Sequence, residues 1–235
     1  MSRKIEISAA YARLVLQSGV APAAELLLGV ASTASTENAL PEAEFIDAAQ
    51  LGVLFRNYDR CVNDCAWTAR LGSQFSIAAH GPLGFAALSA PTLGEAMDVM
   101  GTLYASRNTA MTAYTYATDT HYVLHVDDAT GESDVARWLL EVVLKVIEHL
   151  LSTILGHPVG KNVLISFSHA APPDSARLIS AYDAAVIFDA SENSIAVPQA
   201  WRLLPSPLYD ESFYRANVIR CRELIAAREQ AGSVA

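Results

Sequence analysis

Two cysteines are the side chains of this sequence whose spacing first suggests chemistry. Cys61 and Cys65 are four residues apart, which on a helix places their Cβ atoms about 6 Å apart, close enough for two thiolates to share a metal. A structural zinc needs four ligands, however, and no second C-x-x-C or H-x-x-x-H pair lies near them. Burial as small apolar side chains is the alternative for both, and it is also the interpretation of Cys221.

Other motifs of catalysis are missing from the sequence. His121 and His125 have the H-x-x-x-H spacing, but on a strand they lie about 13 Å apart, too far to bind one ion. The sequence contains no G-x-S-x-G, G-x-x-x-x-G-K-[ST], G-x-G-x-x-G or H-E-x-x-H pattern. We therefore expect no catalytic residue, no metal, no cofactor and no enzymatic activity.

Aromatic side chains are the remaining candidates for contact with a small molecule, because their apolar bodies and polar tips can enclose one. The candidates on a predicted hairpin, its flanking helices and the next strand are Tyr104, Tyr114, Tyr116, Tyr122, Trp138 and Phe167. Tyr114 and Tyr116 lie on the same face of one strand, and Tyr122, Leu124 and Val126 lie on the same face of the next strand. At least one of these two sets should face the helices. Ordinary core packing is the alternative for each.

A long helix must position several of these residues. Ser133 or Asp134 can cap its start, and Gly156 ends it after about 22 residues, or roughly 33 Å. Its apolar stripe consists of Val135, Trp138, Leu139, Val142, Val143, Val146, Leu150 and Ile154. Its polar stripe, which we expect to lie opposite the core, consists of Arg137, Glu141, Lys145, Glu148 and Ser152. Asp should therefore abolish folding at position 146 and be tolerated at position 145.

The remaining elements predict an α+β fold, with helices packed on one face of a mainly antiparallel sheet and an N-terminal helical part. Helices are expected over residues 8–18, 22–30, 41–58 with Pro41 in the first turn, and 59–71 with Gly72 as a left-handed cap, and a loop over Ala31–Ala39. Strands are expected over 114–118, 122–126, 163–169, 185–188 and 194–197. Hairpins contradict a doubly wound parallel fold.

Two segments carry a family resemblance. Ser73–Met100 reads SQFSIAAHGPLGFAALSAPTLGEAMDVM, in which Thr92 and Glu95 fit a capping box at the start of an amphipathic helix. It resembles the N-terminal arabinose-binding-type sensory domain of AraC-family transcriptional regulators, which often reads G-x-L-G-Y/F-A before a T-L-G-E-A helix. Gly156–Leu204 is similar to the closing block of that domain, with F-x-H, a proline-bearing loop, V-x-F and A-x-x-V-P-x-x-W.

The resemblance implies a domain that binds a small-molecule effector and acts as a homodimer. His80 and His169 lie in the matching segments, and each is interpreted either as a structural residue or as an effector ligand. DNA contact is expected only through a C-terminal helix-turn-helix domain that is not present in this chain. The expected organisation is an N-terminal helical part (1–72), an α+β effector-binding part (73–206) and a C-terminal linker helix (207–235).

Charge argues against direct nucleic-acid binding. Sixteen Lys and Arg against 25 Asp and Glu give a formal net charge of −9, and the scattered Arg215, Arg220, Arg222 and Arg228 form no basic cluster that would neutralise phosphates. No apolar run follows the first residues as in a secretory signal, and charges interrupt the most hydrophobic segment, 135–155. We expect a cytoplasmic protein with no membrane contact.

The C-terminal helix leaves two interpretations open. Its apolar seam consists of Phe213, Val218, Cys221, Leu224 and Ile225. The seam packs either on its own domain or on a second copy by two-fold symmetry. The sequence thus favours a sensing and dimerisation domain, with a ligand-free dimerisation module and a small enzyme as alternatives.

Overall fold

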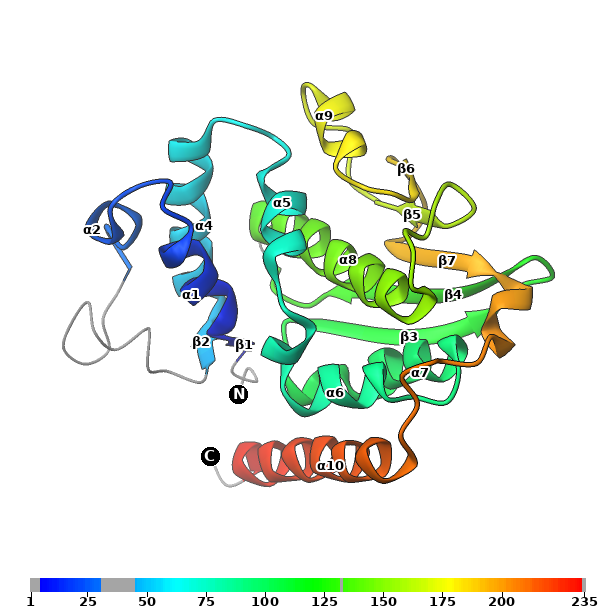
Figure 1. Ribbon diagram of the computed structural model, residues 1–235. Coiled ribbons are helices and arrows are strands. Elements are labelled where there is room, and N and C mark those ends of the chain that lie inside the picture. The colour runs from blue at the N-terminus through cyan, green and yellow to red at the C-terminus, as the bar shows by residue number, and fades with distance from the viewer. Residues whose placement is uncertain (1–4, 31–44, 132, 234–235) are drawn as a thin grey trace.

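The computed structural model describes residues 5–30, 45–131 and 133–233, and a five-stranded sheet lies at its centre (Figure 1). Its strands are β3 (Met111–Ala117), β4 (His121–Asp128), β5 (Leu164–Ser166), β6 (Ala185–Ile187) and β7 (Ser194–Pro198). They stand in the order β3-β4-β7-β5-β6, and only β5 and β6 pair in parallel. The expected α+β fold with a mainly antiparallel sheet is confirmed.

The two faces of this sheet have different neighbours. On one face the hydroxyl of Tyr122, which is 4% exposed, donates to the carboxylate of Asp98 on α7 (Leu93–Leu103). Tyr114 and Tyr116 lie on the opposite face, where Tyr114 is 49% exposed. One set of tyrosines therefore faces the helices, as the two-residue period predicted.

Helix α7 begins where its sequence indicates. The hydroxyl of Thr92 accepts a hydrogen bond from the backbone N–H of Glu95 at 3.1 Å, which confirms the cap. The carboxylate of Glu95 accepts at 3.4 Å from the hydroxyl of Tyr214, on the C-terminal helix, rather than returning to Thr92. Half of the expected capping box thus forms, and the other half becomes a contact with a distant helix.

Helix α8 (Ser133–Leu155) has the expected bounds but not the expected surroundings. It is buried on its apolar side, where Val146 is 5% exposed, and equally on its polar side, where Glu141, Lys145 and Glu148 are 1%, 8% and 1% exposed. The expectation that the polar stripe lies away from the core is wrong, and with it the expectation that Lys145→Asp is tolerated.

A second helix covers the polar side of α8. Helix α5 (Trp67–Gln74) lies along it (Figure 1), and a Cβ on Gly72 would come within 2.8 Å of the Lys145 Cβ and of the Val142 carbonyl oxygen. Only a glycine permits this approach. Gly72 therefore lies inside a helix and is not the left-handed cap that the sequence suggested.

The N-terminal region departs further from expectation. A strand pair that the patterns did not predict, β1 (Glu6–Ser8) with β2 (Phe45–Asp47), joins helices α1 (Ala10–Gln17), α2 (Ala23–Leu26) and α4 (Ala48–Val62). Asp47 accepts from the N–H of Gln50 at 2.7 Å and so sets the start of α4. The helix ends at Asn63, whose φ of 48° breaks the helix expected over 59–71. The predicted loop 31–39 and Pro41 fall outside the described residues.

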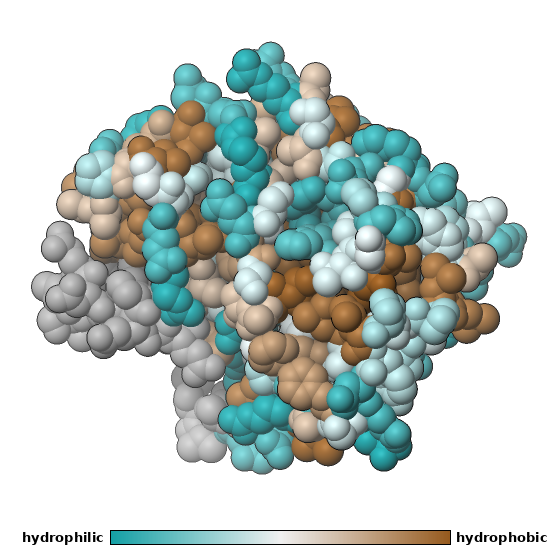
Figure 2. All heavy atoms as spheres, in the orientation of Figure 1, coloured by the Kyte–Doolittle hydropathy of each residue, from teal (hydrophilic) through white to brown (hydrophobic). Residues whose placement is uncertain are grey.

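Helix α10 (Glu211–Ser233) packs against its own domain, along α6 (Pro82–Leu88) (Figure 1). Cys221 is fully buried there, and the ring of Phe213 lies 5.4 Å from that of Phe85. Figure 2 shows hydrophobic patches among hydrophilic ones along this helix. The remaining elements are η1 (Ile77–His80), η2 (Tyr104–Ser106), α9 (Ser175–Ser180) and η3 (Gln199–Leu203).

Candidate functional site

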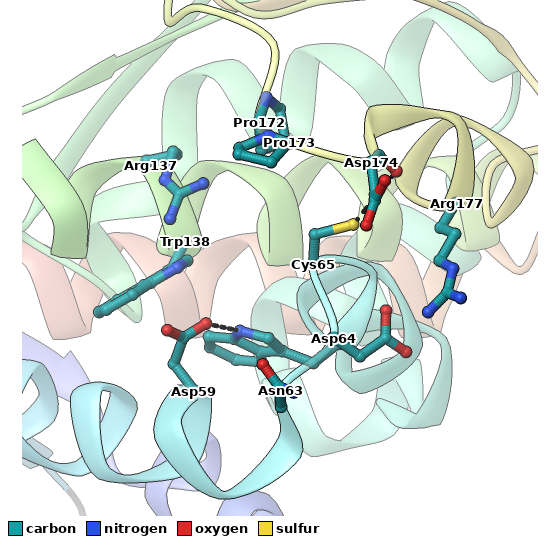
Figure 3. A pocket seen from close by; sticks show the side chains of 11 residues that line it. Asp59, Asn63, Asp64, Cys65, Arg137, Trp138, Pro172, Pro173, Asp174 and Arg177 are labelled. Atoms are coloured by element: carbon teal, nitrogen blue, oxygen red, sulfur yellow. Dashed lines mark hydrogen bonds between the residues drawn. The ribbon is translucent and has the colours of Figure 1, made fainter.

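A cleft of about 290 Å³ opens where four segments meet: the end of α4, the start of α5, the first turns of α8 and the loop that leads into α9 (Figure 3). Ligand pockets in proteins range from about 300 to 1,000 Å³, so this volume suits a small molecule. Its lining consists of Asp59, Asn63, Asp64, Cys65, Trp67, Arg137, Trp138, Pro172, Pro173, Asp174 and Arg177.

The turn between α4 and α5 builds one wall. Because Asn63 adopts a left-handed conformation, the chain reverses there and brings Asp59 within 2.6 Å of the indole N–H of Trp67, from which it accepts a hydrogen bond. A backbone N–H bond from Ala66 lowers the pKa of Asp64, which also pairs with Arg70. Asp64 is therefore held ionised at the rim.

Cysteine 65 ties this wall to the loop that precedes α9. Its thiol donates to the carbonyl oxygen of Asp174 at 3.3 Å, and burial raises the pKa of the thiol. Cys61 lies a helical turn earlier, with its sulfur 3.6 Å from a carboxylate oxygen of Glu25. Neither cysteine is fully buried, so the interpretation of both as small core side chains is only partly met. Among the described residues, no three His, Cys, Asp or Glu side chains are grouped to hold a metal ion.

Two indole rings form the floor. Trp67 and Trp138 are 1% and 5% exposed, and their ring centroids lie 5.8 Å apart. Phe55 and Tyr58 contact the Trp67 ring edge-on at 5.3 and 5.2 Å. Edge-to-face packing of this kind fixes the rings, so the floor is rigid.

Arg137 is the cation at the inner end of the cleft. Its guanidinium lies 5.6 Å from the centroid of the Trp138 ring, beside Pro172 and Pro173 (Figure 3). Within the part of the chain that the structure describes, no carboxylate oxygen lies within 4.0 Å of it. A partly buried guanidinium without an anion is a preferred partner for a carboxylate, which it can bind through two parallel hydrogen bonds.

Glu141 lies one turn further along α8, behind Arg137. One of its oxygens accepts from the hydroxyl of Thr68 at 2.5 Å. The other lies 3.4 Å from Nε2 of His169 without hydrogen-bond geometry, and no described residue satisfies it. Burial raises the pKa of Glu141 to about 7 and lowers that of His169.

Three of the residues expected to bind an effector therefore lie at or near this cleft. Trp138 lines it, His169 faces Glu141 behind it, and Phe167 is fully buried with its ring 5.0 Å from that of His169.

Two other expected residues lie in the N-terminal core. His80 packs its ring 5.4 Å from Phe75 and 6.4 Å from Tyr11, and burial lowers its pKa to about 4. Tyr104 is also buried, and its hydroxyl accepts from the side-chain amide of Asn108 at 3.2 Å. Tyr104 has the surroundings of a structural residue, whereas the buried Nε2 of His80 has no hydrogen-bond partner among the described residues.

The remaining tyrosines belong to the sheet. Tyr122 faces α7, whereas Tyr114 and Tyr116 lie on the outer face around His125. Tyr114 stacks on that imidazole at 4.6 Å, and Glu192 accepts from Tyr116 at 2.6 Å and lies 2.9 Å from Nδ1 of His125. The eight expected residues thus occupy four separate places.

The sequence reasoning missed Asp59, Arg137 and Glu141. One signal was present: between the two stripes of α8, additional apolar residues complete the circumference, namely Leu140, Leu144, Ile147 and Leu151. A helix that is hydrophobic nearly all round is buried all round. A charged side chain on such a helix is buried, so it needs an ion-pair or hydrogen-bond partner, or it belongs to a functional site.

A family model matches most of the chain. The arabinose-binding domain of AraC transcription regulators, N-terminal, matches residues 27–206, a range that includes every residue lining the cleft. The chain belongs to this family. Membership supports a regulatory, ligand-sensing role for this arabinose-binding domain.

Similarity to solved structures agrees at the level of fold. The crystal structure of transcriptional regulator CdpR from Pseudomonas aeruginosa superposes with a TM-score of 0.56 at 15% sequence identity, over 76% of this chain and 58% of that one. The chain thus spans less than two thirds of CdpR. No curated protein matches the sequence. None of the helices in the described ranges is both long and apolar enough to cross a membrane.

Proposed function

We propose that this arabinose-binding domain senses a small metabolite in the cleft between α4, α5, α8 and the loop before α9. One observation carries the proposal: among the described residues, no carboxylate oxygen lies within 4.0 Å of Arg137, which lines the cleft, and one oxygen of Glu141, a turn further along α8, has no hydrogen-bond partner. A buried polar group without a hydrogen-bond partner requires an explanation, such as a bound ligand, ion or water. An anionic ligand in the cleft would pair with Arg137.

The path from the cleft to the C-terminal helix is short. Helix α5 forms one wall of the cleft and leads through η1 into α6, against which α10 packs. Arg228 of α10 also donates to the carbonyl oxygen of Ala105. A ligand that changes the position of α5 along α8 would therefore shift the support of α10 and bias whatever is attached beyond it.

The proposal also includes association with a second copy and control of DNA binding by an attached helix-turn-helix domain. In it, residues 1–72 are the helical part, 73–206 the effector-binding part and 207–235 the linker. The dimer is supported by exposed apolar side chains, because large exposed patches mark interaction sites. Of the ten large hydrophobic residues that are exposed in the described part of the chain, six fall within one segment: Leu203, Leu204, Leu208, Tyr209, Phe213 and Ile219. The buried half of the α10 seam, around Cys221, packs on its own domain.

Thermal unfolding of the chain with a metabolite panel tests the sensor. At a hundredfold excess over Kd, a ligand stabilises the folded state by about 2.7 kcal/mol. Arg137→Met should remove that gain in stability. Arg202→Met is the matched control and should keep it, because Arg202 also covers an aromatic ring, that of Tyr122 at 4.8 Å, but does not line the cleft. A ligand whose stabilisation survives Arg137→Met and is lost in Arg202→Met would place sensing elsewhere.

Light scattering tests the dimer. Phe213→Ser with Ile219→Ser removes two exposed side chains, 46% and 55% accessible, and should turn a dimer into a monomer. Circular dichroism checks that the variant, which also loses the Phe213–Phe85 ring contact, stays folded. If the wild-type chain is monomeric with and without ligand, the association surface is not on α10.

A further inference from the structure

The charges around the cleft point to the class of its ligand. Two arginines and three aspartates are among the eleven residues that line it. We propose that the cleft binds a small zwitterion of the amino-acid type, with its carboxylate on Arg137 and its amine at Asp59. The inference rests on the proposed function and makes it specific.

The carboxylate half of the proposal follows from Arg137. Among the described residues, Glu141 acts on it electrostatically but no carboxylate oxygen lies within 4.0 Å, and its guanidinium is turned into the cleft beside Pro172 and Pro173 (Figure 3). A planar guanidinium with free N–H groups matches the two oxygens of a carboxylate in geometry and in charge.

The amine half follows from Asp59. Its Oδ1 accepts from the Trp67 indole at 2.6 Å, and the structure describes no donor for Oδ2, which leaves that oxygen for a ligand cation. Glu141 does not line the cleft, but it interacts electrostatically with Asp59 and keeps one oxygen that no described residue satisfies. An ammonium group supplies three donors in one compact charge.

Other ligand classes fit less well. Sugars are commonly held on an exposed aromatic face, but Trp67 and Trp138 are 1% and 5% exposed and present none. A dianion would meet Asp59, Asp64 and Asp174 on a chain of net charge −9. A fatty acid needs an apolar channel, whereas five of the eleven lining residues here are charged.

Calorimetric titration of the intact chain tests the class. The panel holds the common L-amino acids, L-arabinose, D-xylose and succinate, followed by two analogues of the best amino acid, its carboxamide and its desamino acid. We expect one amino acid to bind and each analogue to bind at least about tenfold more weakly, since each loses a charge-assisted hydrogen bond.

Variants then assign each charge to a residue. Arg137→Met should weaken the amino acid at least about tenfold and erase the difference between acid and carboxamide. Asp59→Asn, whose amide oxygen can still accept from Trp67, should erase the difference between the amine and its desamino analogue. Arg202→Met should leave all affinities unchanged.

The outcomes distinguish an error in the ligand class from an error in the proposed sensing function. A pentose or succinate that binds and loses affinity in Arg137→Met overturns the zwitterion and leaves the sensor intact. Failure of every compound in the panel to bind overturns both. Because the analogue series uses the wild-type chain, the class is decided even if a variant fails to fold.

Discussion

The polar stripe of α8 has two halves that differ in how their charged groups are paired. In the C-terminal half, Lys145 pairs with Glu148, whose other oxygen accepts from the N–H of Ala184 at 2.8 Å, and the Lys145 ammonium lies 5.3 Å from the Tyr182 ring centroid. In the N-terminal half, no described carboxylate oxygen lies within 4.0 Å of Arg137, and one oxygen of Glu141 has no hydrogen-bond partner among the described residues.

This difference indicates that one half of the stripe stabilises the fold and the other half serves the cleft. A buried charge pair with all its hydrogen bonds made can hold two layers together, and removing one member leaves an uncompensated charge. In the open half, Arg137 has no carboxylate within 4.0 Å among the described residues, and the raised pKa of buried Glu141 makes stability depend on pH. Mutation of the closed half should therefore lower stability, mutation of Arg137 should weaken binding, and mutation of Glu141 should change the pH dependence of stability.

The largest effect should come from Lys145→Asp. This change places a second carboxylate beside Glu148 in a site that is 8% exposed, so we expect loss of folding, equal to that of Val146→Asp on the apolar side. Circular dichroism and solubility measure both, with exposed Thr153→Asp as the control, expected within about 1 kcal/mol of wild type. A cooperatively folded Lys145→Asp protein would mean that this side of α8 faces water.

Glu148→Gln should cost about 3–5 kcal/mol, because it leaves the Lys145 ammonium buried without its counter-charge. Urea unfolding gives the value. A loss below about 1 kcal/mol would mean that the Lys145–Glu148 pair contributes no more to stability than the N-terminal half of the stripe.

Glu141→Gln should change the pH dependence of stability instead. The raised pKa of Glu141, about 7 against an ordinary 4.5, means that its contribution is full below pH 4.5 and is lost as pH rises through 7, by about 3 kcal/mol. The groups around it are Arg137 on α8, Asp59 on α4, Thr68 on α5 and His169 after β5.

The measurement is the difference in unfolding free energy between variant and wild type at pH 5 and pH 8. Glu141→Gln should gain relative to wild type at pH 8. The variant is compared with wild type because His80 also makes stability depend on pH. Its pKa is lowered to about 4, so stability falls as pH drops from 6.5 to 4 in both proteins. A difference that is constant with pH contradicts the burial of an open Glu141.

Arg137→Met should have the smallest effect on stability, under about 1 kcal/mol, since no ion pair is lost and the side chain keeps its apolar contact with Trp138. Lys145→Met is the matched comparison and should cost several kcal/mol through the stranded Glu148. Equal losses for the two methionine variants would contradict the separation of the halves.

Local signals predicted the fold where local physics decides it. The Thr92 cap, the hairpin of β3 and β4 and the bounds of α8 follow from capping and periodicity and are confirmed. The insertion of β7 between β4 and β5 has no local signal, because strand order is set by tertiary packing.

The site was predicted less well for the same reason. Trp138 was named from its residue type, whereas Asp59, Arg137 and Asp174 come from three segments that only the folded chain brings together. The turn at Asn63, on which Asp59 and Trp67 depend, breaks a helix that the sequence pattern extended.

The indole N–H signals of the three tryptophans test the central claim most directly. Trp67 and Trp138 line the cleft, and Trp201 lies in η3 outside its lining. In ¹⁵N-resolved NMR spectra, a ligand that stabilises the chain should shift the signals of Trp67 and Trp138 and leave that of Trp201 in place. A saturating ligand that moves Trp201 alone, or none of the three, would contradict the assignment of sensing to this cleft.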